Sequence, residues 1–253
     1  MVLAAVILLA IVLIYLLMPK AKSEASSFDP ERYKDLLQQN VAFYQKLDHS
    51  EQDLFLKKVI NFLSKVKIEG VGTEVEDLDR VLIASSAIIP IFHFGDWEYR
   101  NITSVILYPD TFNEEFQFEG TERSVLGMVG NGFMNGQMIL SKNSLRGGFR
   151  SPADGKNTAI HEFVHLLDKS DGEVDGIPDL LLQHSYSIPW VQAMHKEIRR
   201  IEKGKSDIDP YAITNEAEFF AVAAEYFFEK PEKMQRRYPE LYALLGKMFN
   251  PEN

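Results

Sequence analysis

Two histidines and a glutamate at helical spacing inside an apolar segment constrain the fold of this chain more than any other feature. They are His161, Glu162 and His165, in the pattern HExxH. On an α-helix, positions four residues apart lie one turn apart on the same face, so both imidazoles can reach one point. The surrounding residues are apolar: Ile160, Phe163, Val164, Leu166 and Leu167. We therefore expect a largely buried helix that begins near Asn157 and Thr158.

The same three residues predict a metal centre on that helix. Buried imidazoles and a buried carboxylate are costly unless something pairs them, which argues against two surface histidines on an amphipathic helix. Two imidazoles one turn apart can bind a zinc ion, and the glutamate beside the first can reach water on the metal. Zinc lowers the pKa of that water, and the glutamate can take its proton. We predict that His161 and His165 bind zinc and that Glu162 acts beside them.

A third metal ligand has to come from elsewhere in the chain. A catalytic zinc takes three protein ligands, and because the chain has no cysteine, the third must be His, Asp or Glu. His184 and His195 are candidates, as are the acids of segment 215–228. In that segment Glu218 and Glu225 stand seven residues apart among Phe, Ala and Val, two turns along one helical face. Packed against the first helix, this segment would offer Glu218 as a ligand and Glu225 as the partner of a ligand.

Two further features close to the HExxH segment have open interpretations. Asp168 follows His165 by three residues on the same face. It could accept a hydrogen bond from an imidazole Nδ1–H, or it could equally make a cap or loop contact. The apolar segment 137–141 is predicted as a strand, and it could be the sheet edge that aligns a peptide substrate. Trp97 and Trp190 are interpreted as packing residues.

The order of the elements along the chain predicts an α+β fold that is mainly helical with a small sheet. We expect helices from Asp29 onward, from Ser50 onward and over 77–94, the last ending near Pro90. Strands are expected over 66–71, 105–108 and 137–141, with a loop over 114–134 and a glycine-rich turn at 146–148. The net charge of −10, with no basic stripe, argues against a nucleic-acid-binding protein.

The N-terminus carries an unbroken apolar run from Val2 to Met18. Seventeen residues are at the short end of what spans a bilayer, and the run lacks the basic start of a signal peptide. A cleaved signal or a buried helix are the alternatives to a transmembrane helix. Lys20 and Lys22 follow the run, and the positive-inside rule then places the body of the protein in the cytoplasm. We predict an anchor over 1–19, a tether over 20–29 and one peptidase domain over 30–253.

Several motifs together resemble the zinc-peptidase family of Mlc titration factor A. They are the HExxH segment through Asp168, Asp171-Gly172, Asp175-Gly176-Ile177-Pro178, Asp209-Pro210-Tyr211-Ala212 and Ala217-Glu218 through Phe228. The resemblance spans roughly residues 30 to 250 and is weak before about residue 100. The family's catalytic core is similar to that of the anthrax lethal factor protease, a zincin with a glutamate ligand.

The resemblance implies a zincin-like fold, one zinc per chain and a set of site residues. By position the ligands are His161, His165 and Glu218, with Glu162 as the general base. Tyr211 falls where such enzymes carry a tyrosine that hydrogen-bonds the developing oxyanion. Members of the family are soluble and bind a glucose-related transcriptional repressor, whereas this chain adds the apolar N-terminal run.

These observations predict a zinc-dependent metallopeptidase that acts on a peptide or protein substrate. A zinc-containing binding protein that recognises a transcriptional regulator or another protein is the alternative. The presence of Glu162 favours the enzyme, because a binding site needs no general base. A structural zinc site is disfavoured, since such sites take four protein ligands, usually with cysteine.

Overall fold

The computed structural model describes residues 29–113, 117, 125–129, 135–150, 156–178 and 184–250. The described helices are α2 (Pro30–Asn40), α3 (Ala42–Gln45), α4 (His49–Lys65), α5 (Asp77–Ile91), α6 (Lys142–Arg150), α7 (Thr158–Asp168), α8 (His184–Glu202), α9 (Glu216–Glu229), α10 (Pro231–Arg237) and α11 (Pro239–Phe249), with 3-10 helices η3 (Lys169–Asp171) and η4 (Pro210–Ile213). The strands are β1 (Lys67–Gly70), β2 (Ser104–Tyr108), β3 (Gly127–Val129) and β4 (Gln137–Ser141). The α+β class and the helical majority are confirmed.

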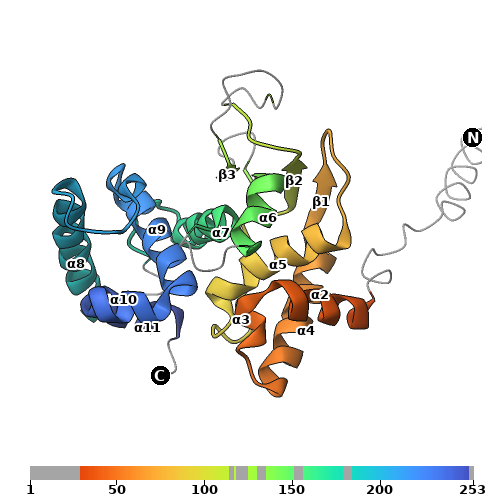
Figure 1. Cartoon of the computed structure of the whole chain (residues 1–253), viewed down its shortest axis with the longest axis horizontal. Coiled ribbons are helices and arrows are strands. Elements are labelled where there is room, and N and C mark those ends of the chain that lie inside the picture. The colour runs from red at the N-terminus through yellow and green to blue at the C-terminus, as the bar shows by residue number, and fades with distance from the viewer. Residues whose placement is uncertain are drawn as a thin grey trace, which may run out of the picture.

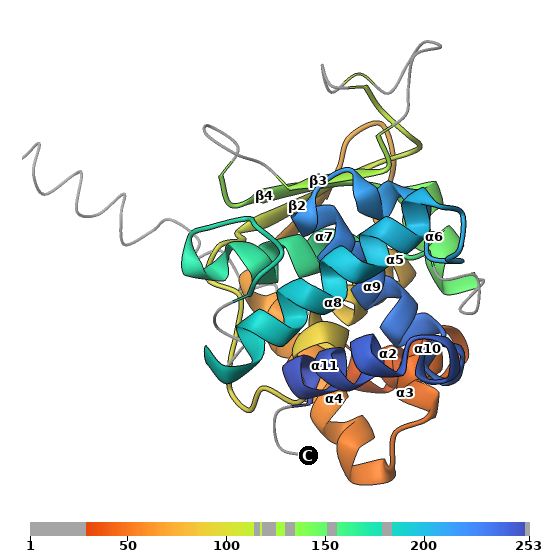
Figure 2. The same cartoon turned by 90° about the vertical axis from the view of Figure 1, so that its left-hand side faces the viewer.

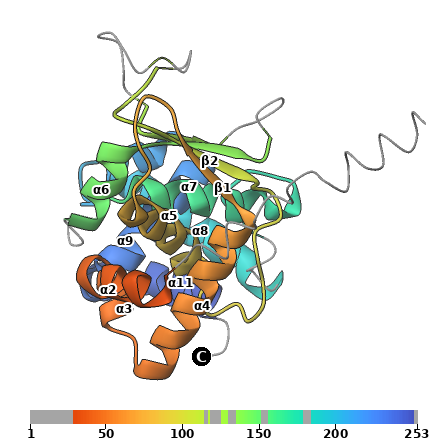
Figure 3. The same ribbon diagram turned by 90° about the vertical axis from the view of Figure 1, so that its right-hand side faces the viewer.

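The four described strands form one sheet in the order β1-β2-β4-β3. β1, β2 and β4 run parallel, and β3 pairs antiparallel with β4. The main helices lie against one face of this sheet, as Figures 2 and 3 show from two sides. Side chains therefore alternate along the strands: Val105 and Leu107 join the main core on the helical side, whereas Ile106 and Tyr108 join a small cluster on the other face.

Helix α7 lies at the centre of the helical layer. It packs against α5 on one side and α9 on the other, and it also touches β3, β4 and α6. Figure 1 shows α7 between the C-terminal helices α8 to α11 and the N-terminal part of the domain. Phe163 and Val164, in the middle of α7, have no exposed surface. This position explains why the segment is almost entirely apolar apart from the residues that face the site.

The structure corrects the predicted glycine-rich turn at 146–148. These residues lie within helix α6, which follows β4 directly. Tertiary contacts decide this conformation, because Arg146 pairs through Nε with the buried Asp79 at 2.7 Å. A Cβ on Gly148 would lie 2.9 Å from Cγ of Asn157. The glycine thus permits close packing of α6 against the start of α7.

The structure also corrects two predictions about the sheet. Segment 137–141 is a strand as predicted, but β4 lies between β2 and β3 and therefore cannot be the edge. Segment 114–134, predicted as a loop, contains the short strand β3, which with β1 is one of the two edge strands of the described sheet. A three-residue strand is too short to give a clear alternating pattern, so sequence periodicity could not indicate it.

The predicted anchor over Val2–Met18 and most of the predicted tether lie outside the described residues. Within the described ranges, no helix is both long enough and apolar enough to cross a membrane. The anchor and its orientation stay predictions.

Candidate metal centre

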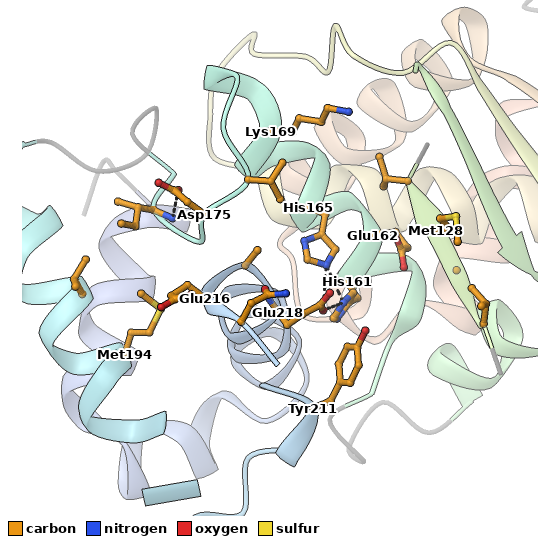
Figure 4. Close-up of a pocket in the computed structure, with 18 of the residues that line it drawn as sticks. Met128, His161, Glu162, His165, Lys169, Asp175, Met194, Tyr211, Glu216 and Glu218 are labelled. Carbon is orange, nitrogen blue, oxygen red and sulfur yellow. Dashed lines mark hydrogen bonds and ion pairs between the residues drawn. The ribbon is translucent and has the colours of Figure 1, made fainter. Parts of the chain in front are cut away.

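Helix α7 is placed by its N-terminal cap and by its two apolar flanks. Asn157 is the cap residue, and its side chain accepts a hydrogen bond from the backbone N–H of Ile160 at 3.2 Å. The predicted start near Asn157 is confirmed. With the flanks buried against α5 and α9, the remaining face of α7 turns His161, Glu162 and His165 toward one cleft (Figure 4).

Three side chains bring their donor atoms together in that cleft. His161 Nε2 lies 2.9 Å from Glu218 Oε2, His165 Nε2 lies 3.3 Å from the same oxygen, and the two Nε2 atoms are 3.0 Å apart. Tetrahedral zinc with bonds of about 2.0–2.1 Å would place its ligand atoms about 3.3 Å apart. The observed triangle is slightly tighter than that. Two nitrogens and one carboxylate oxygen therefore fit a zinc ion with one position left for water or substrate.

The third corner of this triangle is positioned by the start of α9. Asn215 caps the helix, and its side chain accepts a hydrogen bond from the backbone N–H of Glu218 at 2.9 Å. Glu218 thus stands in the first turn of α9, pointing at α7. Of the other candidates for a third ligand, His195 lies apart from the cluster, with Nε2 3.5 Å from Glu216 Oε1. The side chain of His184 lies outside the described residues.

Glu225 supports the centre from two turns further along α9. Its Oε1 lies 2.7 Å from His161 Nδ1, and its Oε2 accepts the backbone N–H of Asn157 at 2.6 Å. An Nδ1–H donated to this carboxylate leaves the Nε2 lone pair of His161 directed at the centre. The carboxylate is only 7% exposed, so both contacts are sheltered from water. Sequence reasoning placed Glu225 beside a ligand, but the involvement of Asn157 was missed.

The charges at the centre favour a cation. Burial lowers the pKa of His161, but hydrogen bonds to Glu218 and Glu225 outweigh it and raise that pKa to about 10. Burial raises the pKa of Glu218, yet its contacts with His161 and His165 bring it down to about 2. Both shifts report a strong demand for positive charge between the carboxylates. A divalent metal ion would meet the same demand.

Glu162 lies on the opposite side of the histidines from α9, close to β3 (Figure 4). Its side chain is 7% exposed. Burial raises its pKa, although the neighbouring imidazoles of His161 and His165 act in the other direction. A buried carboxylate whose pKa is raised in this way binds a proton more readily than an exposed one, which suits it to proton transfer.

Tyr211 stands at the mouth of the cleft on η4. Its ring centroid is 6.0 Å from that of His161, and its hydroxyl points toward the centre in Figure 4. The residue is 54% exposed and lines the cleft. Asp209 fixes the turn, because its side chain accepts the backbone N–H of Tyr211 at 3.0 Å.

Asp168 makes the loop contact that was one of its two interpretations. Its Oδ2 accepts the backbone N–H of Gly176 at 3.0 Å, and the carbonyl of Gly176 accepts Nε1–H of Trp190 at 2.7 Å. Within the described chain, Asp168 Oδ1 and His165 Nδ1 are both buried without a hydrogen-bond partner. Burial raises the pKa of Asp168 to about 6. Trp190, interpreted as a packing residue, is therefore also a donor that ties α8 to this loop.

The cleft around the centre has a volume of about 740 Å³. One wall is β3, with Gly127, Met128 and Val129, and the floor is α7. The opposite wall comes from the 172–178 loop, α8 and α9 and is mixed. It has apolar side chains at Val174, Ile177, Val191, Met194 and Ala217, and polar ones at Asp175, His195 and Glu216. Figure 4 shows Met128 and Met194 on opposite sides of the histidines.

Comparison with known proteins identifies one matching family and several relatives of similar length. The profile of the glucose-regulated metallo-peptidase M90 family matches residues 18–250. The chain is 30% identical to Mlc titration factor A of Pectobacterium atrosepticum over 192 residues, which covers 70% of this chain and 69% of that protein. It is 28% identical to Mlc titration factor A of Escherichia fergusonii over 241 residues, or 88% and 87% of the two chains. An uncharacterised Synechocystis protein is 28% identical over 231 residues, or 87% and 84%.

Proposed function

This chain belongs to the glucose-regulated metallo-peptidase M90 family, and from that premise we propose that it is a zinc-dependent peptidase. We assign His161, His165 and Glu218 as the ligands of one zinc ion per chain, in a site of the zincin type. The observation that carries the proposal is the triangle of donor atoms, with sides of 2.9, 3.0 and 3.3 Å, beside a buried glutamate in one open cleft. A His₂Glu set with an open fourth position is a catalytic rather than a structural zinc arrangement.

Each residue has a defined task in this proposal. Zinc, when bound, supplies a Lewis acid that polarises a carbonyl and makes water more acidic. Glu162 is the general base that takes the proton from the attacking water and later delivers it to the leaving amine. Glu225 holds His161 in the tautomer and orientation that the centre needs. Tyr211 donates its O–H to the oxygen on which negative charge develops, and its exposure on the cleft rim lets substrate reach it.

The substrate we propose is an extended polypeptide. Of the two edge strands of the described sheet, β1 and β3, only β3 lines the cleft, so its backbone is the part of the sheet placed to pair with a peptide strand. This assignment replaces segment 137–141, which is internal. The apolar residues of α8 and the 172–178 loop, Ile177, Val191 and Met194, would take an apolar side chain of the substrate.

A Glu162→Gln variant tests the proposed chemistry. The amide keeps the shape of the side chain but cannot take a proton, so we expect peptide hydrolysis to fall about 10²–10⁴-fold with zinc content unchanged. Glu216→Gln is the matched control, because Glu216 is a half-exposed acid on the cleft that stands outside the triangle. Hydrolysis of a mixed peptide pool that continues at the wild-type rate in Glu162→Gln would exclude Glu162 as the base.

A second candidate function is binding of a protein regulator. It is favoured by the name of two relatives, Mlc titration factor A. Exposed apolar side chains near the cleft mouth, among them Val174 and Tyr211, also favour it. Two results together would favour this function over the peptidase. The wild type would bind zinc but hydrolyse no peptide, and Glu162→Gln would capture a protein partner as strongly as the wild type does.

We also propose that Val2–Met18 anchors the protein in a membrane with its domain on the cytoplasmic side. The family match begins at residue 18, which leaves residues 2–17 of this run outside the matched domain. Protease treatment of sealed membrane vesicles of known orientation tests this. Loss of the protein from the membrane fraction in a carbonate wash would exclude the anchor.

A further inference from the structure

Gly127 occupies the position of β3 that faces the proposed base. β3 pairs with β4 in a register that places Gly127 opposite Leu140 and Val129 opposite Met138. Residues directly opposite in an antiparallel pair point to the same face of the sheet. Leu140, Met138 and Val129 all contribute to the main core on the helical side. Gly127 therefore faces α7, and it has no side chain to place there.

Side chains of α7 fill the space that a side chain at position 127 would take. A Cβ on Gly127 would lie 2.8 Å from Glu162 Cγ, 3.0 Å from Glu162 Oε1 and 2.9 Å from Thr158 Cγ2. Carbon–carbon contacts of 2.8 and 2.9 Å essentially never occur, so one of the groups would have to move. The bare backbone of β3 thus forms one wall of the slot that holds the Glu162 carboxylate.

Backbone conformation does not require a glycine at this position. Among the described glycines, those with positive φ are Gly72, Gly95, Gly136, Gly172, Gly176 and Gly204, and Gly127 is not one of them. A glycine inside a strand carries an entropic cost and packs nothing. The close contact with Glu162 and Thr158 is therefore the reason why a glycine is needed at position 127.

We infer that Gly127 is a positioning residue, whose missing side chain lets the edge strand close over Glu162 and hold its carboxylate toward the metal centre. This inference rests on the proposed function of Glu162 as a base. The contact itself is independent of that function, so stability can test it separately from activity.

The first experiment compares Gly127→Ala with wild type and with Gly147→Ala. Gly147 is the matched control, since a Cβ there meets nothing within 4 Å. Displacement of a reacting group by about 1 Å can cost about 10²-fold in rate. We expect Gly127→Ala to lower kcat by about 10–100-fold, with KM within about 3-fold of wild type and zinc content unchanged. A folded, zinc-loaded Gly127→Ala protein with the kcat of wild type would overturn the inference.

The second experiment measures thermal unfolding in a double-mutant cycle of the whole chain. Gly127→Ala is made in the native background and in a Glu162→Ala background, where the group that the new Cβ strikes has been removed. We expect Gly127→Ala to lower Tm by about 2–4 °C more in the native background than in the Glu162→Ala background. The reason is that the new Cβ strikes the Glu162 side chain only in the native background. The contact with Thr158 is present in both backgrounds and cancels.

The two experiments separate the inference from the function on which it rests. Equal Tm shifts in the two backgrounds would overturn the inference even if the enzyme is active. A wild-type protein that hydrolyses no peptide would refute the proposed function, while unequal Tm shifts would still support the contact between Gly127 and Glu162. If Gly127→Ala fails to fold, recovery of folding in Gly127→Ala/Glu162→Ala supports the inference, and continued failure overturns it.

Discussion

Replacement of Glu225 by glutamine should weaken zinc binding although Glu225 does not itself contribute to the triangle of donor atoms. The carboxylate holds two donors at once, His161 Nδ1–H at 2.7 Å and the Asn157 backbone N–H at 2.6 Å. A glutamine has one oxygen, so it can accept one of these bonds and must present its NH₂ group to the other donor. The variant therefore loses a buried bond and the negative charge that orients His161.

The expected magnitude follows from the role of Glu225 as the partner of a ligand. Loss of such a partner typically lowers metal affinity by about 10–100-fold. That range corresponds to about 1.4–2.7 kcal/mol of binding free energy. The burial of Glu225, at 7% exposure, keeps water from replacing the lost contact and places the expected effect in the upper part of the range.

Competition with a chromophoric chelator at fixed pH gives the apparent zinc Kd. Glu216→Gln on the same helix is the control, because Glu216 is half-exposed and pairs only with His195 among the contacts described for its side chain. We expect an unchanged Kd in the control and a Kd raised by at least about tenfold in Glu225→Gln. Equal affinities in the two variants would refute the reasoning that the Glu225–His161 contact prepares the centre.

Two further predictions concern the surroundings of the site. Gly176 has a φ of +72°, and a Cβ there would lie 2.2 Å from the Glu216 carbonyl oxygen. In a denaturant titration, Gly176→Ala should therefore lower the free energy of unfolding by at least about 2 kcal/mol. Gly172→Ala is the control, with positive φ but open space, and should lower it clearly less; equal losses would contradict the clash. Burial raises the pKa of Asp207, but Lys233, Tyr238 and Tyr226 outweigh it and hold that pKa at about 2, below its ordinary value of 3.8. The stabilisation is therefore complete above about pH 4 and is lost as pH falls toward 2, by about 1–2 kcal/mol; Tm measured against pH should fall less steeply in Asp207→Asn, and parallel curves would contradict the assignment.

Local patterns predicted the parts of the site that lie on single elements. The i, i+4 spacing of His161 and His165 is a property of one helix, and the cap at Asn157 marks its start. Glu218 and Glu225 were found because a seven-residue spacing puts both carboxylates on one face of an apolar helix. His161 and Glu218 are 57 residues apart in sequence. The short distance between their side chains depends on how the two helices pack, and the sequence pattern does not show that packing.

Tertiary contacts decide the features that sequence patterns missed. Segment 146–148 looks like a turn because glycines are adjacent, yet the ion pair between Arg146 and Asp79 and the close approach of Gly148 to Asn157 hold it as a helix. Gly127 has no local signal, because its meaning depends on Glu162, which is 35 positions away in the chain. Trp190 has an apolar neighbourhood that suggests packing, and only the fold reveals the acceptor of its Nε1–H.

Zinc content measured by elemental analysis on the purified chain tests the central claim most directly. We predict one zinc per chain in the wild type and in Glu216→Gln, and a strongly reduced content in Glu218→Gln, because Glu218 supplies the only carboxylate oxygen of the donor triangle found in the described residues. A wild-type chain that takes up no zinc, or a Glu218→Gln chain that holds it as firmly as Glu216→Gln, would contradict the account.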